Sequence, residues 1–198
     1  MSQEEIKLTG TTKTEDLLNS LPLPIWTFLP DGTCDYLSPQ WAQYTGRPSD
    51  EPYSAGCLPY IHPEDRERIS AEWRETVTRI QPLNTEMRVR RADGVYRWFH
   101  AHALPVLDQD GRVLKWVGTY TDIDDRKQTQ EAQARLAAIV ESSSDAIMSK
   151  CLRGGIRTWN KGAERLFGYS SEEIVGQPIS RILPPDRLEE ETALIEQI

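Results

Sequence analysis

Two long stretches of β-forming residues, separated by a short polar turn, place the strongest constraint on the fold of this 198-residue chain. Residues 95–106 and 113–121 are rich in aromatic and β-branched residues, and the polar residues 108–111 lie between them. This pattern predicts two antiparallel strands joined by a tight turn. At period two, one face carries Phe99, Ala101, Ala103, Trp116, Gly118 and Tyr120, and the other carries Trp98, His100, His102, Val113, Val117 and Thr119. Neither face is plainly polar, so we expect both sides of the sheet to be covered.

The second strand passes directly into a helical segment. The β-branched run stops at Asp122, and residues 124–142 are charged and rich in Gln and Ala. Either Asp122 or Asp124 can cap the helix that begins here. Asp122 and Arg126 stand about one helical turn apart, so we expect their side chains to form an ion pair across the junction of sheet and helix.

Two motifs in this region resemble the C-terminal half of a PAS domain: W-x-G at Trp116 to Gly118, and D-I-D-D-R-K at Asp122 to Lys127. The resemblance implies an α+β fold, in which a five-stranded antiparallel sheet with helices on one face cups a small core or ligand. It also implies that signals leave through a D-I-T-like triplet, which here ends in Asp instead of Thr. The residues assigned to signal relay are Asp122, Ile123, Asp124 and Arg126.

Composition argues against several classes of partner. The formal net charge is −8 with no block of Lys and Arg, which argues against nucleic acid or an anionic membrane surface. The most apolar stretches, 21–29 and 136–140, are too short or too interrupted by Pro to span a bilayer, and residues 1–10 lack the pattern of a signal peptide. The cysteines, Cys34, Cys57 and Cys151, form no C-x-x-C pair, which suits a reducing compartment. We therefore expect a cytoplasmic location.

The segment before the long strands predicts a hairpin followed by a helix. Two apolar runs, 25–29 and 33–37, flank Pro30-Asp31-Gly32, which is typical of a turn between strands. Ser38, followed by Pro, then predicts the start of a helix that ends at Gly46.

A longer helix is predicted to begin at Pro63, with His62 as its capping residue. The spacing of its apolar residues predicts one buried stripe, made of Ile69, Trp73, Val77 and Ile80. Residues 83–89 predict the third strand. Near the N-terminus, Thr12 and Glu15 have the spacing of a capping box, which predicts a short helix.

The chain also contains an internal repeat. A shift of 122 residues places Gly154 on Gly32, Asn160 on Ser38 and Gly168 on Gly46. The second copy is closer to the PAS pattern than the first, notably in W-N-x-G-A-E-R-L-F-G-Y-S-x-E-E from Trp159. Two copies at a domain-sized period indicate tandem domains rather than a solenoid.

The repeat sets the expected domain boundaries. Residues 1–20 are an N-terminal tail with a short helix, 21–123 a PAS domain, 124–142 a linker helix, and 143–198 the N-terminal part of a second PAS domain. The second core is expected to use Ile147, Ile156, Trp159, Leu166, Phe167, Ile174, Ile182, Leu183, Leu194 and Ile198. The three strands that would cover these residues are missing from this copy, so we expect the part beyond about residue 142 to be partly unfolded or completed by a partner chain.

Cys57 lies where the flavin-binding LOV branch of the PAS family places its reactive cysteine. The residues around it, Gly56, Leu58 and Ile61, do not match that branch, and Tyr120, Phe99 and Ala101 replace its amide side chains. The helix of residues 64–80 has no His to act as a haem ligand. No cofactor is therefore predicted, flavin and haem are disfavoured, and we expect the purified protein to be colourless.

His100 and His102 share a strand face and could chelate a metal if a third ligand joined them. The sequence offers no third ligand, so we predict no metal site and expect surface or interface histidines.

Small residues on the other face predict a pocket. Ala101, Ala103 and Gly118 stand where larger apolar residues would fill a core, and aromatic side chains can surround the space. The candidate ligand pocket consists of Trp73, Phe99, Ala101, Trp116, Gly118, Tyr120 and Cys57. The alternative is that the aromatic side chains interdigitate with the small residues and fill the space.

The linker helix predicts a homodimer. Its apolar residues keep the spacing of a coiled-coil seam, extended by polar positions, at Asp125, Thr129, Ala132, Leu136 and Ile139. We expect parallel dimers through this helix and the outer sheet face around Trp98. The alternative is a single amphipathic helix packed on its own domain.

Three functions remain open. The first is a sensory module that binds a small molecule or partner and relays the signal through the linker helix to an output domain of the parent protein, such as a histidine kinase. The second is a ligand-free module for dimerisation and relay. The third is an enzyme, for which no Ser-His-Asp set, nucleotide-binding loop or G-G-D-E-F motif is found in the sequence. We therefore expect no catalysis from this chain.

Overall fold

The computed structural model describes residues 18–48, 51–52 and 56–184. It divides into two compact units, Met1–Lys127 and Gln128–Ile198. The capping box expected at Thr12 and Glu15 lies outside the described residues, as do Leu194 and Ile198. Within the described ranges, none of the helices combines the length and the apolar content needed to cross a membrane.

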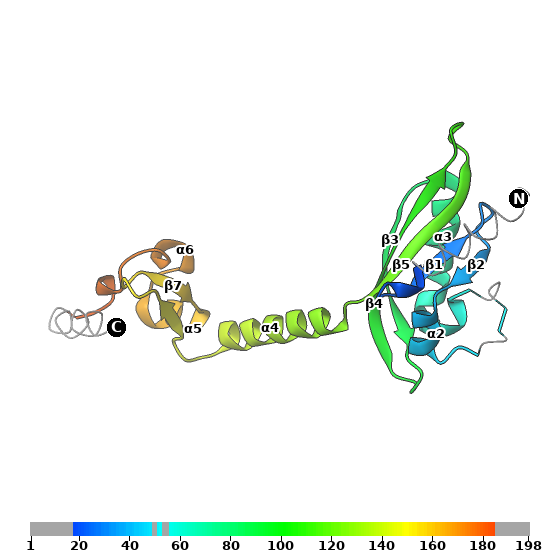
Figure 1. Ribbon diagram of the computed structural model, residues 1–198. Coiled ribbons are helices and arrows are strands. Elements are labelled where there is room, and N and C mark those ends of the chain that lie inside the picture. Colours follow the sequence, from blue (N-terminus) through cyan, green and yellow to red (C-terminus); the bar gives the residue numbers. More distant parts are fainter. Residues whose placement is uncertain (1–17, 49–50, 53–55, 185–198) are drawn as a thin grey trace, which may run out of the picture. The chain divides into compact units, whose positions relative to one another are not determined.

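The first unit is built on a five-stranded antiparallel sheet, which confirms the predicted fold (Figure 1). Its strands are β1 (Ile25–Phe28), β2 (Cys34–Leu37), β3 (Leu83–Arg90), β4 (Tyr96–Leu107) and β5 (Val113–Asp122). The order across the sheet is β2-β1-β5-β4-β3. Because β5 pairs with both β1 and β4, the last strand of the domain lies at the centre of the sheet.

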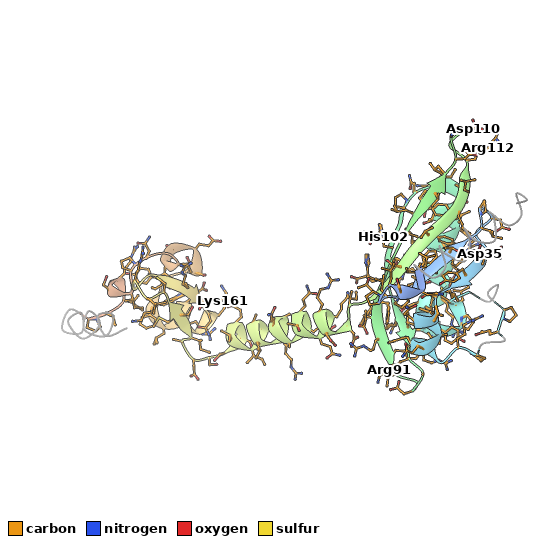
Figure 2. The ribbon with its side chains drawn as sticks, in the orientation of Figure 1. Asp35, Arg91, His102, Asp110, Arg112 and Lys161 are labelled. Atoms are coloured by element: carbon orange, nitrogen blue, oxygen red, sulfur yellow. The ribbon has the colours of Figure 1, made fainter. Side chains whose placement is uncertain are left out.

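The β4–β5 hairpin is the longest pairing of the sheet. Asp110 and Arg112 lie at its tip, at the opposite end of the sheet from Arg91 (Figure 2). A register shift between Val106 and Leu107 marks a bulge near this tip. The bulge moves the partner of every later β5 residue by one position along β4, which matters for the contacts at the end of β5.

The helices of this unit lie on one side of the sheet (Figure 1). They are α2 (Pro39–Thr45), the 3-10 turn η2 (Leu58–Tyr60) and α3 (Pro63–Arg79). As predicted, α2 ends at Gly46, whose φ of 69° is in the left-handed region that favours glycine. Ser38 makes no capping bond to α2; its Oγ instead accepts a hydrogen bond from the backbone N–H of Ile25 at 3.0 Å. This bond ties the start of β1 to the start of α2.

The helix α3 begins as the sequence predicts but ends before the last expected core residue. Nδ1 of His62 accepts a hydrogen bond from the backbone N–H of Glu64 at 3.3 Å. Ile69 is buried, and Trp73 and Val77 pack against the core from its edge. The expectation for Ile80 is wrong, because this residue is the C-cap, with a φ of 51°, and its side chain is 46% exposed.

The faces of β4 and β5 divide as the period-two pattern predicts. The helix-facing residues are buried: Phe99, Ala101, Ala103, Trp116 and Tyr120. Trp98, His100 and His102 on the outer face are only half-buried, and Leu104 and Val106 are 49% and 44% exposed. The helix-facing side is therefore covered in full, as expected, whereas the outer face is covered only in part.

The helix α4 (Asp124–Ser142) has the predicted bounds of the linker helix. Its first residue, Asp124, is buried, whereas Leu136 and Ile139 are 63% and 57% exposed. The seam residues Leu136 and Ile139 are therefore open to solvent within their own unit.

The second unit repeats the start of the first. It contains β6 (Met148–Lys150), β7 (Ile156–Trp159), α5 (Lys161–Phe167), α6 (Ser171–Ile174) and the 3-10 turn η3 (Ile179–Arg181). A shift of 122 residues maps β2 onto β7 and α2 onto α5 end to end. The backbone N–H of Ile147 donates to Oδ1 of Asn160 at 2.9 Å, which repeats the bond between Ile25 and Ser38. The internal repeat is therefore a repeat of structure.

The core of the second unit is smaller than predicted. Ile156, Trp159 and Ile174 are buried, and Phe167, Ile182 and Leu183 pack against them. Two predictions are wrong: Ile147 is 38% exposed and Leu166 is 69% exposed.

The first unit gives the physical reason for the exposure of Leu166. The equivalent of Leu166 is Tyr44, which packs edge-on against Phe99 of β4, with 4.8 Å between ring centroids. The described residues of the second unit form only two strands and include no counterpart of β4. Leu166 therefore has no strand to cover it among these residues.

Candidate functional site: an apolar pocket and the junction with the exit helix

An apolar pocket of about 350 Å³ lies between α3 and the helix-facing side of the sheet. This volume is at the lower end of the usual range for small-molecule sites, about 300–1,000 Å³. Most lining side chains are apolar or aromatic, with Thr, Ser, Cys and one Arg at intervals. The lining residues are Trp26, Phe28, Gly32, Thr33, Cys34, Gly56, Cys57, Leu58, Ile69, Ser70, Trp73, Arg74, Leu83, Thr85, Met87, Ala101 and Tyr120.

Four of the predicted pocket residues line this pocket: Trp73, Ala101, Tyr120 and Cys57. Three do not. Phe99 packs against Tyr44, and Trp116 is fully buried behind Trp73, with 5.5 Å between their ring centroids.

Gly118 is the third residue that was wrongly placed in the pocket. A Cβ atom at this position would lie 2.3 Å from Cζ2 of Trp26, because the indole ring rests directly on the glycine. The interdigitation alternative therefore holds at Gly118, while the pocket itself opens beside Ala101.

Sequence reasoning missed the wall formed by Trp26 and Phe28. Together with Trp73, these rings form a cluster of edge-to-face contacts with centroids 4.8–5.6 Å apart. The signal was present, since Trp26 and Phe28 stand two apart on a strand and must share a face. Cys34, Ile69 and Met87 were also missed as lining residues.

The two thiols and the phenol that line the pocket are held in their neutral forms. The side chains of Cys57 and Tyr120 are hydrogen-bonded to each other, and burial raises the pKa of both. Burial also raises the pKa of Cys34 to about 12. At neutral pH the interior of the pocket therefore carries no charge from these groups.

The junction between β5 and α4 is held by an arginine that the sequence analysis did not identify. Nε of Arg97 lies 2.8 Å from a carboxylate oxygen of Asp122, and Nη2 of Arg97 lies 2.7 Å from Oδ1 of Asp125. The predicted pair of Asp122 with Arg126 is wrong, because β4 brings Arg97 to Asp122 while Arg126 reaches Glu86 at 3.4 Å. Asp122 does contribute to the helix start, since its Oδ1 accepts the N–H of Asp124 at 2.9 Å.

A second set of contacts fixes the first turn of α4 from the other side. Nζ of Lys127 lies 2.5 Å from Glu86 and 4.8 Å from the ring centroid of Trp98. The backbone of Trp98 donates to Oδ1 of Asp124 at 3.1 Å and accepts from the N–H of Ile123 at 2.9 Å. The first turn of α4 is therefore bonded to both β3 and β4. It also covers Trp98, so this part of the outer face is occupied.

The outer-face histidines form a stacked pair. The rings of His100 and His102 have centroids 6.3 Å apart, and Nε2 of His100 lies 2.5 Å from Oδ1 of Asn84. Across the part of the chain that the structure describes, no group of three or more His, Cys, Asp or Glu side chains is arranged to hold a metal ion.

Two family models, both described as the PAS fold, match the chain, one over residues 35–120 and the other over residues 134–198. The chain therefore belongs to the PAS family and carries two PAS domains in tandem. The second match begins within α4, before the strands of the second unit.

Several curated proteins are similar to the chain, including the following three. The uncharacterized protein y4lL of Sinorhizobium fredii is 29% identical over 82% of this chain and 20% of its own length. The sensor protein FixL of Bradyrhizobium diazoefficiens is 31% identical over 70% of this chain and 28% of its own. The peroxide stress-activated histidine kinase mak1 of Schizosaccharomyces pombe is 27% identical over 81% of this chain and 10% of its own. The chain thus spans less than a third of each relative, and the likeness supports a role in sensory signalling.

Solved structures agree with the fold. An RNA-binding light-oxygen-voltage receptor superposes with a TM-score of 0.54 at 22% identity, over 65% of this chain and 37% of the receptor chain. At this identity the likeness concerns the fold alone.

Proposed function

We propose that this chain is the sensory part of a longer signalling protein, in which the first PAS domain binds a small molecule and α4 passes the signal to an output domain. A histidine kinase is the output that the relatives favour, and any catalysis belongs to that domain rather than to this chain. The proposal places the protein in the cytoplasm, which the three free thiols support.

The observation that carries the proposal is the pocket of about 350 Å³ beside Tyr120. Tyr120 lines the pocket and lies two residues before Asp122, which Arg97 binds at the start of α4. A ligand that moves the Tyr120 ring would therefore act on the strand end from which the helix departs. The output helix would change its position or stability because its first turn is bonded to the same sheet.

Binding can be tested with N-phenyl-1-naphthylamine, a neutral apolar dye that fluoresces when it leaves water. The full chain should bind the dye saturably at one site. Ala101→Leu should weaken binding at least about tenfold, because the larger side chain occupies part of the pocket and overlaps the ligand. Thr119→Leu makes a similar change on the outer face and should leave binding unchanged, provided that both variants melt close to the parent.

Relay can be tested by amide exchange in the same samples. Saturation with the dye should change the exchange rate of the amides of Ile123 and Lys127, which are bonded across the junction. Absence of saturable binding would favour the ligand-free alternative, in which the module only dimerises and relays. Binding without any change at the junction would contradict the relay.

A further inference from the structure

Arg74 brings a single full charge to an otherwise neutral pocket. It lies on α3 next to Trp73, and both residues line the cavity. Among the described residues that line the pocket, no Asp or Glu is present. Because the thiols of Cys34 and Cys57 stay protonated, the lining carries a net charge of about +1 at neutral pH.

The guanidinium of Arg74 has hydrogen-bond donors to spare. Its Nε donates to the backbone carbonyl of Ser70 at 3.2 Å, and within the described residues the side chain makes no ion pair. A guanidinium has five N–H donors, so most of its capacity is unused. The residues one turn away on α3 are Ser70, Ala71, Val77 and Thr78, none of which is acidic.

Two other arginines of α3 form ion pairs with acids of the same helix. Arg68 pairs with Glu72 at 3.1 Å, and Arg79 pairs with Glu75 at 3.1 Å. Arg68 and Arg79 are thus paired within the helix, whereas Arg74 is not and can pair with a ligand in the pocket.

Asp31 is next to the lining residue Gly32 in the β1–β2 turn, but it does not cancel the charge of Arg74. Asp31 does not line the pocket, and its carboxylate accepts a hydrogen bond from the backbone N–H of Thr33 at 2.8 Å. This bond and a second from the Thr33 hydroxyl lower the pKa of Asp31, so it stays ionised but engaged with its own turn.

We propose that the pocket takes an amphipathic organic anion, a small carboxylate whose apolar part lies among Trp26, Phe28 and Trp73 and whose carboxylate pairs with Arg74. The inference rests on the proposed function, because it requires that the pocket holds a ligand. An apolar chain removes lining surface from water, while a carboxylate can accept two N–H donors of a guanidinium. A cationic ligand would face Arg74 with no acid to bind, and a neutral one would leave the donors unused.

The test compares octanoate with octan-1-ol, which share a chain and differ in the head group, as competitors for the bound dye in the full chain. Octanoate should bind at least about tenfold more tightly than octan-1-ol, because a charge-assisted pair forms only with the anion. Arg74→Gln should weaken octanoate about tenfold or more and leave octan-1-ol unchanged, so that the preference for octanoate is lost. Arg79→Gln removes the same charge from the same helix outside the pocket and should alter neither.

The possible results separate the two proposals. Equal displacement by both competitors, or an equal loss of octanoate binding in both arginine variants, would overturn the assignment of an anion while leaving a ligand-binding pocket. Failure of the dye and of both competitors to bind would overturn the proposed function itself. Tighter octanoate binding that depends on Arg74 alone would support both.

Discussion

At the scale of single residues, the shape of the pocket depends on how Trp26 covers Gly118. A Cβ atom at residue 118 would lie 2.3 Å from the indole ring and 2.8 Å from the backbone oxygen of His102. At these distances either the indole ring or the β4 backbone must shift to admit the methyl group. We therefore expect Gly118→Ala to lower the free energy of unfolding by about 1–3 kcal/mol, as overpacking does.

Denaturant unfolding of Gly118→Ala beside Thr119→Ala would check this expectation. Thr119 is the next residue on the same strand but points to the outer face, so its truncation should cost less than about 1 kcal/mol. A Gly118→Ala variant as stable as the parent would show that the indole ring moves freely.

The three thiols should differ in reactivity. Backbone hydrogen bonds from Arg153 and Gly155 lower the pKa of Cys151, whereas burial raises the pKa of Cys34 and Cys57. Because the thiolate is the reactive form, iodoacetamide at pH 7 should modify Cys151 first in the native protein. Peptide mass spectrometry over time would check the order, with the unfolded chain as the control in which all three react alike. Equal rates in the folded protein would contradict the assigned burial.

The candidate site was predictable in its small residues but not in what fills the space beside them. Ala101 and Gly118 look alike in sequence, as small residues on one strand face. Whether each opens a pocket or accepts a ring depends on the rotamer of Trp26, which belongs to a strand distant in sequence. Such packing is decided by the whole core, so a strand pattern cannot reveal it.

At the scale of elements, the start of α3 is fastened to β3 through Asp65. Its carboxylate accepts from Nε and the backbone N–H of Arg88, both at 3.0 Å, and from a terminal nitrogen of the same residue at 2.9 Å. Asp65→Asn should lower the free energy of unfolding by about 1–3 kcal/mol at pH 7, because bonds to a charged group are lost from a nearly buried site.

The same contact predicts a pH dependence. The side-chain hydrogen bond from Arg88 lowers the pKa of Asp65 below its ordinary value of 3.8. A carboxyl whose pKa is depressed by folding stabilises the protein above its unfolded pKa, and this stabilisation is lost as the pH falls through the folded value. The difference between parent and Asp65→Asn should therefore shrink from about pH 5 downward, which urea unfolding at several pH values would measure. A difference that stays constant to pH 3 would contradict this assignment.

The first turn of α4 should be loosened by a change on β3. Glu86 binds both Lys127 and Arg126 and is 36% exposed, so Glu86→Gln should cost less than about 1 kcal/mol of stability. The amide of Lys127 should nevertheless exchange several-fold faster. Glu75→Gln, which breaks the pair with Arg79 on α3, is the matched control. Unchanged exchange at Lys127 would show that the backbone bonds alone hold the turn.

Sequence patterns gave the bounds of the elements here but not their cross-strand ion pairs. The strands, α2 and α4 follow from periodicity and turn residues. The partner of Asp122 depends on the register of β4 and β5, which the bulge between Val106 and Leu107 shifts by one residue. A local helical spacing therefore pointed to Arg126, while the sheet supplied Arg97.

At the scale of the whole molecule, the open seam of α4 predicts self-association, which we propose as parallel dimers. Leu136 and Ile139 are both more than half exposed. Leu136→Glu should convert dimers to monomers, because a charge in a narrow apolar seam is costly to bury. Gln130→Glu adds the same charge to the same helix outside the seam and should change nothing. Light scattering would check both, and a monomeric parent at high concentration would contradict the proposal.

The hydrogen bond shared by the two copies has a mechanical consequence. In the second unit the acceptor is Asn160 instead of serine, and its Nδ2 donates to the backbone carbonyl of Val140 in the last turn of α4 at 2.8 Å. The first turn of α4 is bonded in turn to β4 through Asp124. Each end of α4 is therefore hydrogen-bonded within the unit that it adjoins, and we expect the loss of either bond to loosen the helix at that end. Ser38, the equivalent residue of the first unit, has no amide nitrogen that could donate such a bond. The exchange of serine for asparagine therefore adds, in the second copy, a bond to the helix that precedes it.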